Sequence, residues 1–160
     1  MMILYRADMR APEAIKKNGF QARMPMTLPT ARSLLLSYCE NRKSPLDLSR
    51  LIISSPQPQY ISTDPDEDCG GYSHKGYIYK IEFELLDKKG WSDSVLGKQL
   101  NLKPNMLWPL LYLNSDKLAM ATAIALKHFG ATKEVTFLTT IQGTNVRAYK
   151  KSGDKQFTKM

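Results

Sequence analysis

The stretch YRADMRAPEAIKKNGF, residues 5–20, decides how the chain begins to fold. The apolar residues 2–5 that lead into it are typical of a β-strand, and a basic, an acidic and a second basic residue follow. Pro12 suits the first position of a helix and Gly19 the position beyond its end, so we predict a short helix over Pro12–Asn18. This strand-to-helix corner places Arg6 at a strand end, where a planar guanidinium can hold a phosphate through two parallel hydrogen bonds.

Length and composition constrain the number of domains and the kind of partner. The 160 residues are 42% hydrophobic, which predicts a single domain over residues 1–160 with its own core. No run of about 18 apolar residues occurs, so we expect no membrane span, and the N-terminus does not read as a signal peptide. Cys39 and Cys69 fit either two free thiols or one bridge. The formal net charge of +8 favours an anionic partner, such as a dinucleotide in a positive cleft or a nucleic acid, and equally suits a solvated basic surface.

Periodicity predicts strands interleaved with helices. Helices are expected over Ala31–Glu40, capped by Thr30, and over Asp116–Phe129, where apolar residues recur at helical spacing. Because the strands and helices do not alternate regularly, we predict the α+β class rather than a doubly wound parallel sheet. The strands are expected over Tyr60–Ser62, Tyr77–Leu85, Glu134–Ile141 and Asn145–Tyr149.

The opening segment also resembles that of the cholera-toxin-like and heat-labile-enterotoxin-like mono-ADP-ribosyltransferases, whose catalytic chains begin with Tyr-Arg-Ala-Asp and continue to a short helix ending in Gly. Three further blocks follow in the family's order. Tyr60–Asp64 resembles its aromatic–hydrophobic–Ser-Thr-Ser element, with Asp64 in place of the last Ser. Residues 76–83 resemble its central strand, and Lys133–Ile141 resembles the strand that begins with the catalytic glutamate.

This resemblance implies an ADP-ribosyltransferase-like fold, with a split, mixed β-sheet core and flanking helices. It implies a toxin or effector that transfers ADP-ribose from NAD, its co-substrate, to a macromolecular acceptor, more readily a protein than a nucleic acid. Such an effector is secreted or injected, acts in the cytoplasm of a target cell and has a delivery or immunity partner. No metal is expected, since His74 and His128 are far apart in the sequence and lack companion ligands.

Residue by residue, the resemblance assigns NAD binding to Arg6, with Ala7 and Asp8 beside it, and to the strand residues Ser62 and Thr63. Cleaving the bond between nicotinamide and ribose resembles glycoside hydrolysis, because positive charge develops on the sugar. The reaction needs a group that fixes the pyrophosphate, one that orients the ribose and a carboxylate beside the developing charge.

Arg6, Ser62 and Glu134 fit these three catalytic roles in that order. The neighbouring Glu82 and Glu84 have the spacing of the family's glutamate pair, but they fall in the strand aligned with the central element. We interpret them as one polar strand face.

Thr132 is the main departure from the family pattern. Arginine-modifying relatives have a second glutamate at this acceptor-side position, two residues before Glu134, and a threonine hydroxyl cannot deprotonate a guanidinium. Transfer to arginine is therefore not expected, whereas NAD cleavage depends mainly on Glu134. Two alternatives stay open: an NAD glycohydrolase, and a catalytically inactive module of the same fold that binds protein or nucleic acid through its basic surface.

Overall fold

A computed structural model describes residues 2–23, 26–31, 33, 60–74, 76–83, 110–113, 123–127 and 134–160. These residues form a mixture of strands and a few short helices, so the predicted α+β class is confirmed. In chain order the elements are β1 (Met2–Asp8), α1 (Pro12–Asn18), β2 (Ile61–Thr63), η1 (Cys69–Gly71), β3 (Tyr77–Phe83), β4 (Leu110–Leu113), β5 (Ala123–Lys127), β6 (Val135–Phe137), η3 (Gly143–Asn145), β7 (Val146–Lys151) and β8 (Thr158–Lys159).

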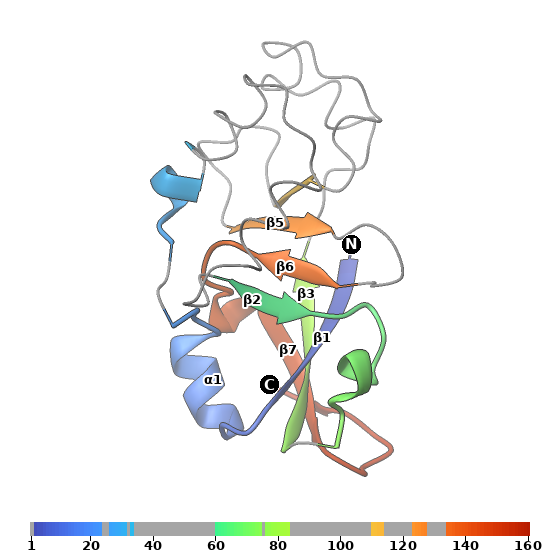
Figure 1. The fold of residues 1–160 in the computed structure, drawn as a ribbon. Coiled ribbons are helices and arrows are strands. Elements are labelled where there is room, and N and C mark those ends of the chain that lie inside the picture. Colours follow the sequence, from blue (N-terminus) through green and yellow to red (C-terminus); the bar gives the residue numbers. More distant parts are fainter. Residues whose placement is uncertain are drawn as a thin grey trace.

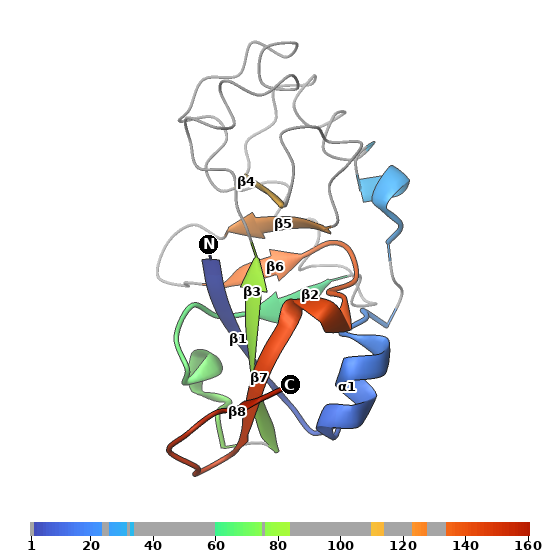
Figure 2. The ribbon, with the colours of Figure 1, turned by 180° about the vertical axis from the view of Figure 1, so that it is seen from behind.

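The strands form two four-stranded sheets. The first has the order β1-β3-β7-β8 and the second the order β2-β6-β5-β4. The strands of the second sheet run across those of the first, as both views show (Figures 1 and 2). Every pairing between the described strands is antiparallel, so the mixture of strand directions that the resemblance implies does not occur among them.

Both sheets contribute to one hydrophobic core. Ile81 and Phe83 on β3 and Leu4 on β1 are buried in the same cluster as Phe137 on β6. The rings of Phe83 and Phe137 have centroids 5.0 Å apart, which joins the first sheet to the second. Burying an aromatic side chain of this size contributes about 1.5–3 kcal/mol, so these contacts hold the two sheets together.

Strand β1 is longer than predicted and meets the second sheet. It continues to Asp8 because β3 pairs with it residue by residue as far as Asp8 opposite Tyr77. Near its middle, the amide of Tyr5 donates to the carbonyl of Asp64 at 2.7 Å, and the amide of Asp64 donates back at 2.9 Å. Arg6 therefore lies inside a strand, beside the seam between the two sheets, rather than at a strand end.

Helix α1 has the predicted bounds, Pro12–Asn18, and its apolar residue Ile15 is buried. Gly19 ends it with a φ of 64°, and its amide donates to the Ile15 carbonyl at 2.7 Å. A second helical segment begins earlier than predicted, at residue 28, and its cap is Thr27 rather than Thr30. The Thr27 hydroxyl oxygen accepts from the Thr30 amide at 3.3 Å. Residues 34–40 of that prediction lie outside the described residues.

The predicted helix over Asp116–Phe129 is wrong where the structure describes it. Ala123–Lys127 form β5, which pairs with β4 on one side and β6 on the other. A short apolar run fits either period, and pairing with two neighbouring strands satisfies the backbone and buries Ala123 and Ala125. The other residues of this prediction lie outside the described ranges. Within those ranges, no helix has the length and apolar character needed to cross a bilayer.

Candidate functional site

A cavity of about 620 Å³ lies where β1, β2 and the residue before β6 come together. Five of the residues singled out in the sequence line it: Arg6, Ala7, Ser62, Thr63 and Glu134. The two other predicted site residues differ in what the structure describes. Asp8 is not part of the lining, and Thr132 lies outside the described residues.

Strand pairing explains how these residues meet. Strand β2 pairs with β6, with Ser62 opposite Thr136 and Thr63 opposite Val135. The buried Thr63 hydroxyl donates to the Val135 carbonyl at 2.7 Å, which fastens the two strands next to Glu134. From the first sheet, Arg6 Nη1 donates to the Ser62 carbonyl at 2.8 Å. Residues far apart in the sequence therefore reach one cavity through backbone pairing.

The Arg6 guanidinium is fixed on one side and accessible on the other. Its Cζ lies 5.4 Å from the centre of the Phe20 ring, and its Nε is buried, 3.6 Å from Asp8 Oδ2, without a hydrogen-bond partner. Burial lowers the pKa of Arg6, but an arginine keeps its charge at neutral pH. The side chain is still 28% exposed, so this charge is accessible to an anion in the cavity.

Asp8 forms the salt bridge of the strand-to-helix corner with Arg10. Arg10 Nε and Nη2 each donate to one carboxylate oxygen at 2.8 Å, and the Arg10 amide donates to Oδ1 at 3.0 Å. Burial opposes ionisation of Asp8, but these hydrogen bonds outweigh it and hold the pKa of the carboxyl below its usual value. Asp8 is also within ion-pair distance of Arg6, with Oδ2 3.6 Å from the Arg6 Nε, so its charge is shared between the two arginines.

The Glu134 carboxylate is held by a neighbour on β6. Thr136, which is fully buried, donates its hydroxyl hydrogen to Glu134 Oε1 at 3.0 Å. Glu134 itself is partly exposed and lines the cavity. One carboxylate oxygen is thus fixed by a rigid strand residue, which orients the group at the cavity wall.

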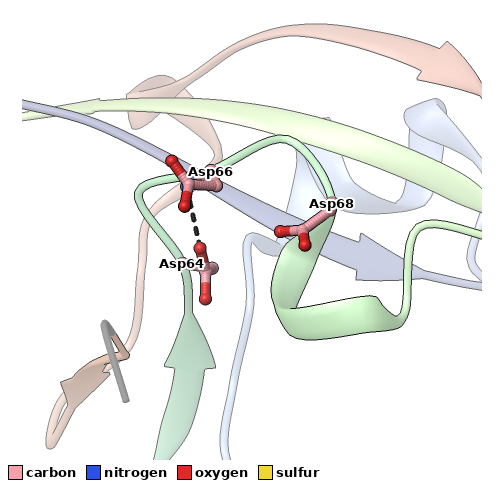
Figure 3. A group of neighbouring side chains, drawn as sticks. All are labelled: Asp64, Asp66 and Asp68. Atoms are coloured by element: carbon pink, nitrogen blue, oxygen red, sulfur yellow. Dashed lines mark hydrogen bonds between the residues drawn. The ribbon is translucent and has the colours of Figure 1, made fainter. Parts of the chain in front are cut away.

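An acidic loop forms another part of the wall. Asp64, Asp66 and Asp68 follow β2 at alternate positions, and one carboxylate oxygen from each lies within 4.8 Å of the other two (Figure 3). The Asp66 amide donates to Asp64 Oδ1 at 2.8 Å, and the Gly70 amide donates to Asp68 Oδ1 at 3.3 Å. With Glu134, four carboxylates and one guanidinium line the described cavity, a net side-chain charge of −3. The positive cleft expected from the overall charge is therefore not found here.

Cys69 also lines the cavity, at the start of η1. It is a buried free thiol, and burial, together with the charges of Asp64 and Asp68, raises its pKa to about 11. At neutral pH the thiol is protonated, so it is a poor nucleophile. Cys39 lies outside the described residues, and Cys69 forms no bridge among those described.

Comparisons with known proteins do not identify a family for this chain. No family model matches the chain, and no curated protein matches it. Among solved structures, one named EcPltA is similar over 99% of this chain and 82% of that chain, with 15% identity and a TM-score of 0.41. A TM-score this low does not establish a shared fold.

Proposed function

We propose that this protein is an NAD-dependent mono-ADP-ribosyltransferase of the toxin or effector type, which modifies a macromolecular acceptor. The observation that carries the proposal is the meeting of Arg6, Ser62 and Glu134 at one cavity of about 620 Å³. These residues come from three segments that are 56 and 72 positions apart along the chain, so only the fold brings them together. The fold expected with this activity, an ADP-ribosyltransferase-like core split into two sheets, is part of the proposal.

The charged groups in the cavity suit two parts of NAD, its pyrophosphate and its nicotinamide ribose. Arg6 offers a charged guanidinium that is 28% exposed, and the phosphates of a dinucleotide are anions that such a group binds well. The acidic side, with Glu134 and the aspartates of the loop, suits ribose hydroxyls and the positively charged nicotinamide ring. Since the aspartates repel phosphate, we expect the pyrophosphate to be confined to the Arg6 end.

In the proposed reaction each residue has a separate task. NAD supplies a nicotinamide–ribose bond, and its cleavage leaves positive charge on the sugar. The Glu134 carboxylate, oriented by Thr136, stabilises that charge electrostatically. Arg6 holds the phosphates, and Ser62 positions the ribose from β2. We propose an acceptor other than arginine, because Thr132 supplies no base.

The proposal is tested by incubating the protein with labelled NAD and a whole-cell lysate. Nicotinamide release is measured in parallel with incorporation of label, followed by protease or nuclease digestion. Release with label lost on protease treatment supports transfer to protein. Release without incorporation would instead assign an NAD glycohydrolase. If neither release nor NAD binding occurs at millimolar concentration, the inactive binding module is correct.

We expect Arg6→Lys to weaken NAD binding about tenfold, because lysine keeps the charge but loses the planar fork and one charge-assisted hydrogen bond. The melting temperature should change little, since the side chain is partly exposed. Calorimetric titration with NAD measures the affinity. Arg23→Lys, at an exposed position away from the cavity lining, is the matched control. Unchanged NAD affinity in Arg6→Lys would show that Arg6 does not bind the dinucleotide.

Thr136→Val should lower the maximal rate of nicotinamide release about tenfold with little change in KM, because one hydrogen bond to a charged group is lost. Valine has nearly the same shape as threonine, so β6 should pack as before. Thr136→Ser retains the hydroxyl and should restore most of the rate. If Thr136→Ser were as slow as Thr136→Val, the hydroxyl would not be acting through Glu134.

A further inference from the structure

A second cavity, of about 540 Å³, has the opposite charge to the first and shares none of its lining residues. Its cations come from four different elements: Lys16 from α1, Lys80 from β3, Arg147 from β7 and Lys159 from β8. In Figure 2 these elements surround the end of the chain. The cations are up to 143 positions apart in the sequence, so the fold brings them together. They are not a run of basic residues in one solvated segment.

Strand register places two of the lysines on one face. Lys80 pairs with Ala148, and Ala148 pairs with Lys159 on the next strand. Residues opposite one another in a sheet project to the same side, and strands are spaced about 4.8 Å apart. The two lysines are therefore separated by roughly 10 Å at their backbones. The side chain of Ala148 between them is small, so it leaves space in the cavity between the two lysines.

Arg147 is directed to the same place by a β-bulge. Lys80 is opposite Ala148, but Ile81 is opposite Val146, so Arg147 is the extra residue between two paired positions. A bulge of this kind changes the direction of the strand and of the side chain it carries. The Arg147 carbonyl accepts from the Met160 amide at 2.9 Å, which ties the bulge to the segment after β8.

Lys16 is brought in by a close approach between α1 and η3. A Cβ on Gly143 would lie 2.2 Å from the Lys16 carbonyl oxygen, so only glycine allows this contact. The exposed Lys16 and Lys159 side chains form no ion pair with another residue in the part of the chain that the structure describes.

Glu82 is the one carboxylate side chain among the described lining residues, and it cannot balance four cations. Its oxygens lie 4.0 Å from Lys80 Nζ and 3.8 Å from Arg147 Nε, both longer than a hydrogen bond. The side chains of this cavity therefore carry a net charge of +3.

We propose that this second cavity binds an oligophosphate, a small anion with two or more linked phosphate groups. The fork of Arg147 matches a phosphate in geometry, while the lysines act as point charges around it. A chain of phosphates carries several negative charges within a few ångströms, which matches cations spread over about 10 Å. The volume lies within the range of small-ligand pockets. The site is independent of NAD cleavage in the first cavity.

The test is calorimetric titration of the full chain with inorganic tripolyphosphate at low ionic strength. Lys80→Gln combined with Arg147→Gln should weaken binding at least about tenfold, because two charge-assisted contacts are lost. Lys151→Gln combined with Lys155→Gln removes the same charge at exposed positions outside the cavity lining and should change the affinity less than about twofold. Melting temperatures confirm that both double variants are folded.

Three outcomes would overturn the proposal: no binding to the wild type at millimolar tripolyphosphate, equal weakening in both double variants, or loss of binding in Arg6→Gln, which would place the phosphates in the first cavity. A parallel titration with a nucleoside triphosphate separates the two sources of such a ligand. Tighter binding of the nucleotide assigns the site to nucleotides, and equal binding assigns it to the phosphate chain alone.

Discussion

Glu134→Gln is expected to lower nicotinamide release from NAD by about a hundredfold or more, the cost typical of removing an electrostatic group that acts on a developing charge. Glutamine has nearly the same shape and can still accept from Thr136, so the local packing should persist. Only the negative charge beside the ribose is lost. Release of labelled nicotinamide at saturating NAD measures the effect, and incorporation of label into the acceptor should fall with it.

Glu82→Gln is the matched control for this prediction. Glu82 belongs to the glutamate pair that has the family's spacing, but it lines the second cavity, whereas Glu134 lines the first. Its replacement should leave nicotinamide release unchanged. If Glu82→Gln abolished release and Glu134→Gln did not, the alignment of the last strand would be wrong. The partner of Glu82 in that pair, Glu84, lies outside the described residues.

Local signals in the sequence were sufficient to predict α1 and β3. Pro12 and Gly19 delimit α1, and the alternation in residues 77–83 gives β3, because both signals depend on neighbouring residues alone. The run Ala123–Lys127 could not be predicted in the same way. Its helical spacing is real, but its conformation is set by pairing with β4 and β6, which are separate segments of the chain.

The sequence was sufficient to predict residues that line the candidate site, but not the charge of the cavity around them. A resemblance in four short blocks selected Arg6, Ser62 and Glu134, and the pairing of β2 with β6 explains why the last two are neighbours. The charge of the first cavity depends on the position of the acidic loop after β2. The overall charge of +8 instead favoured a positive cleft. The basic cavity depends on the pairing register of β3, β7 and β8 and on the bulge at Arg147. A sequence pattern reveals neither of these features.

The largest stability effect is expected for Gly19→Ala. Gly19 has a φ of 64°, where an L-residue with a Cβ is strained, and that Cβ would lie 2.0 Å from the Ile141 carbonyl oxygen. This carbonyl accepts from the Phe20 amide at 2.8 Å, in the bridge that places the Phe20 ring beneath Arg6. Backbone lies on both sides of the clash, so it cannot be relieved by a side-chain rotation. We expect a loss of about 4 kcal/mol in the free energy of unfolding, which lowers the melting temperature by about 10 °C.

Gly153→Ala separates the two causes of that loss. Gly153 also has a positive φ, 92°, but a Cβ there would meet nothing within 4 Å. Its replacement therefore carries the conformational strain without the clash and should cost about 1–2 kcal/mol. Urea titrations of both variants measure the difference. Similar losses in the two variants would mean that conformational strain alone accounts for the effect, and that the chain around Ile141 can move aside. A clearly larger loss in Gly19→Ala would show that the close approach of Gly19 to residues 141–143 adds to the conformational strain.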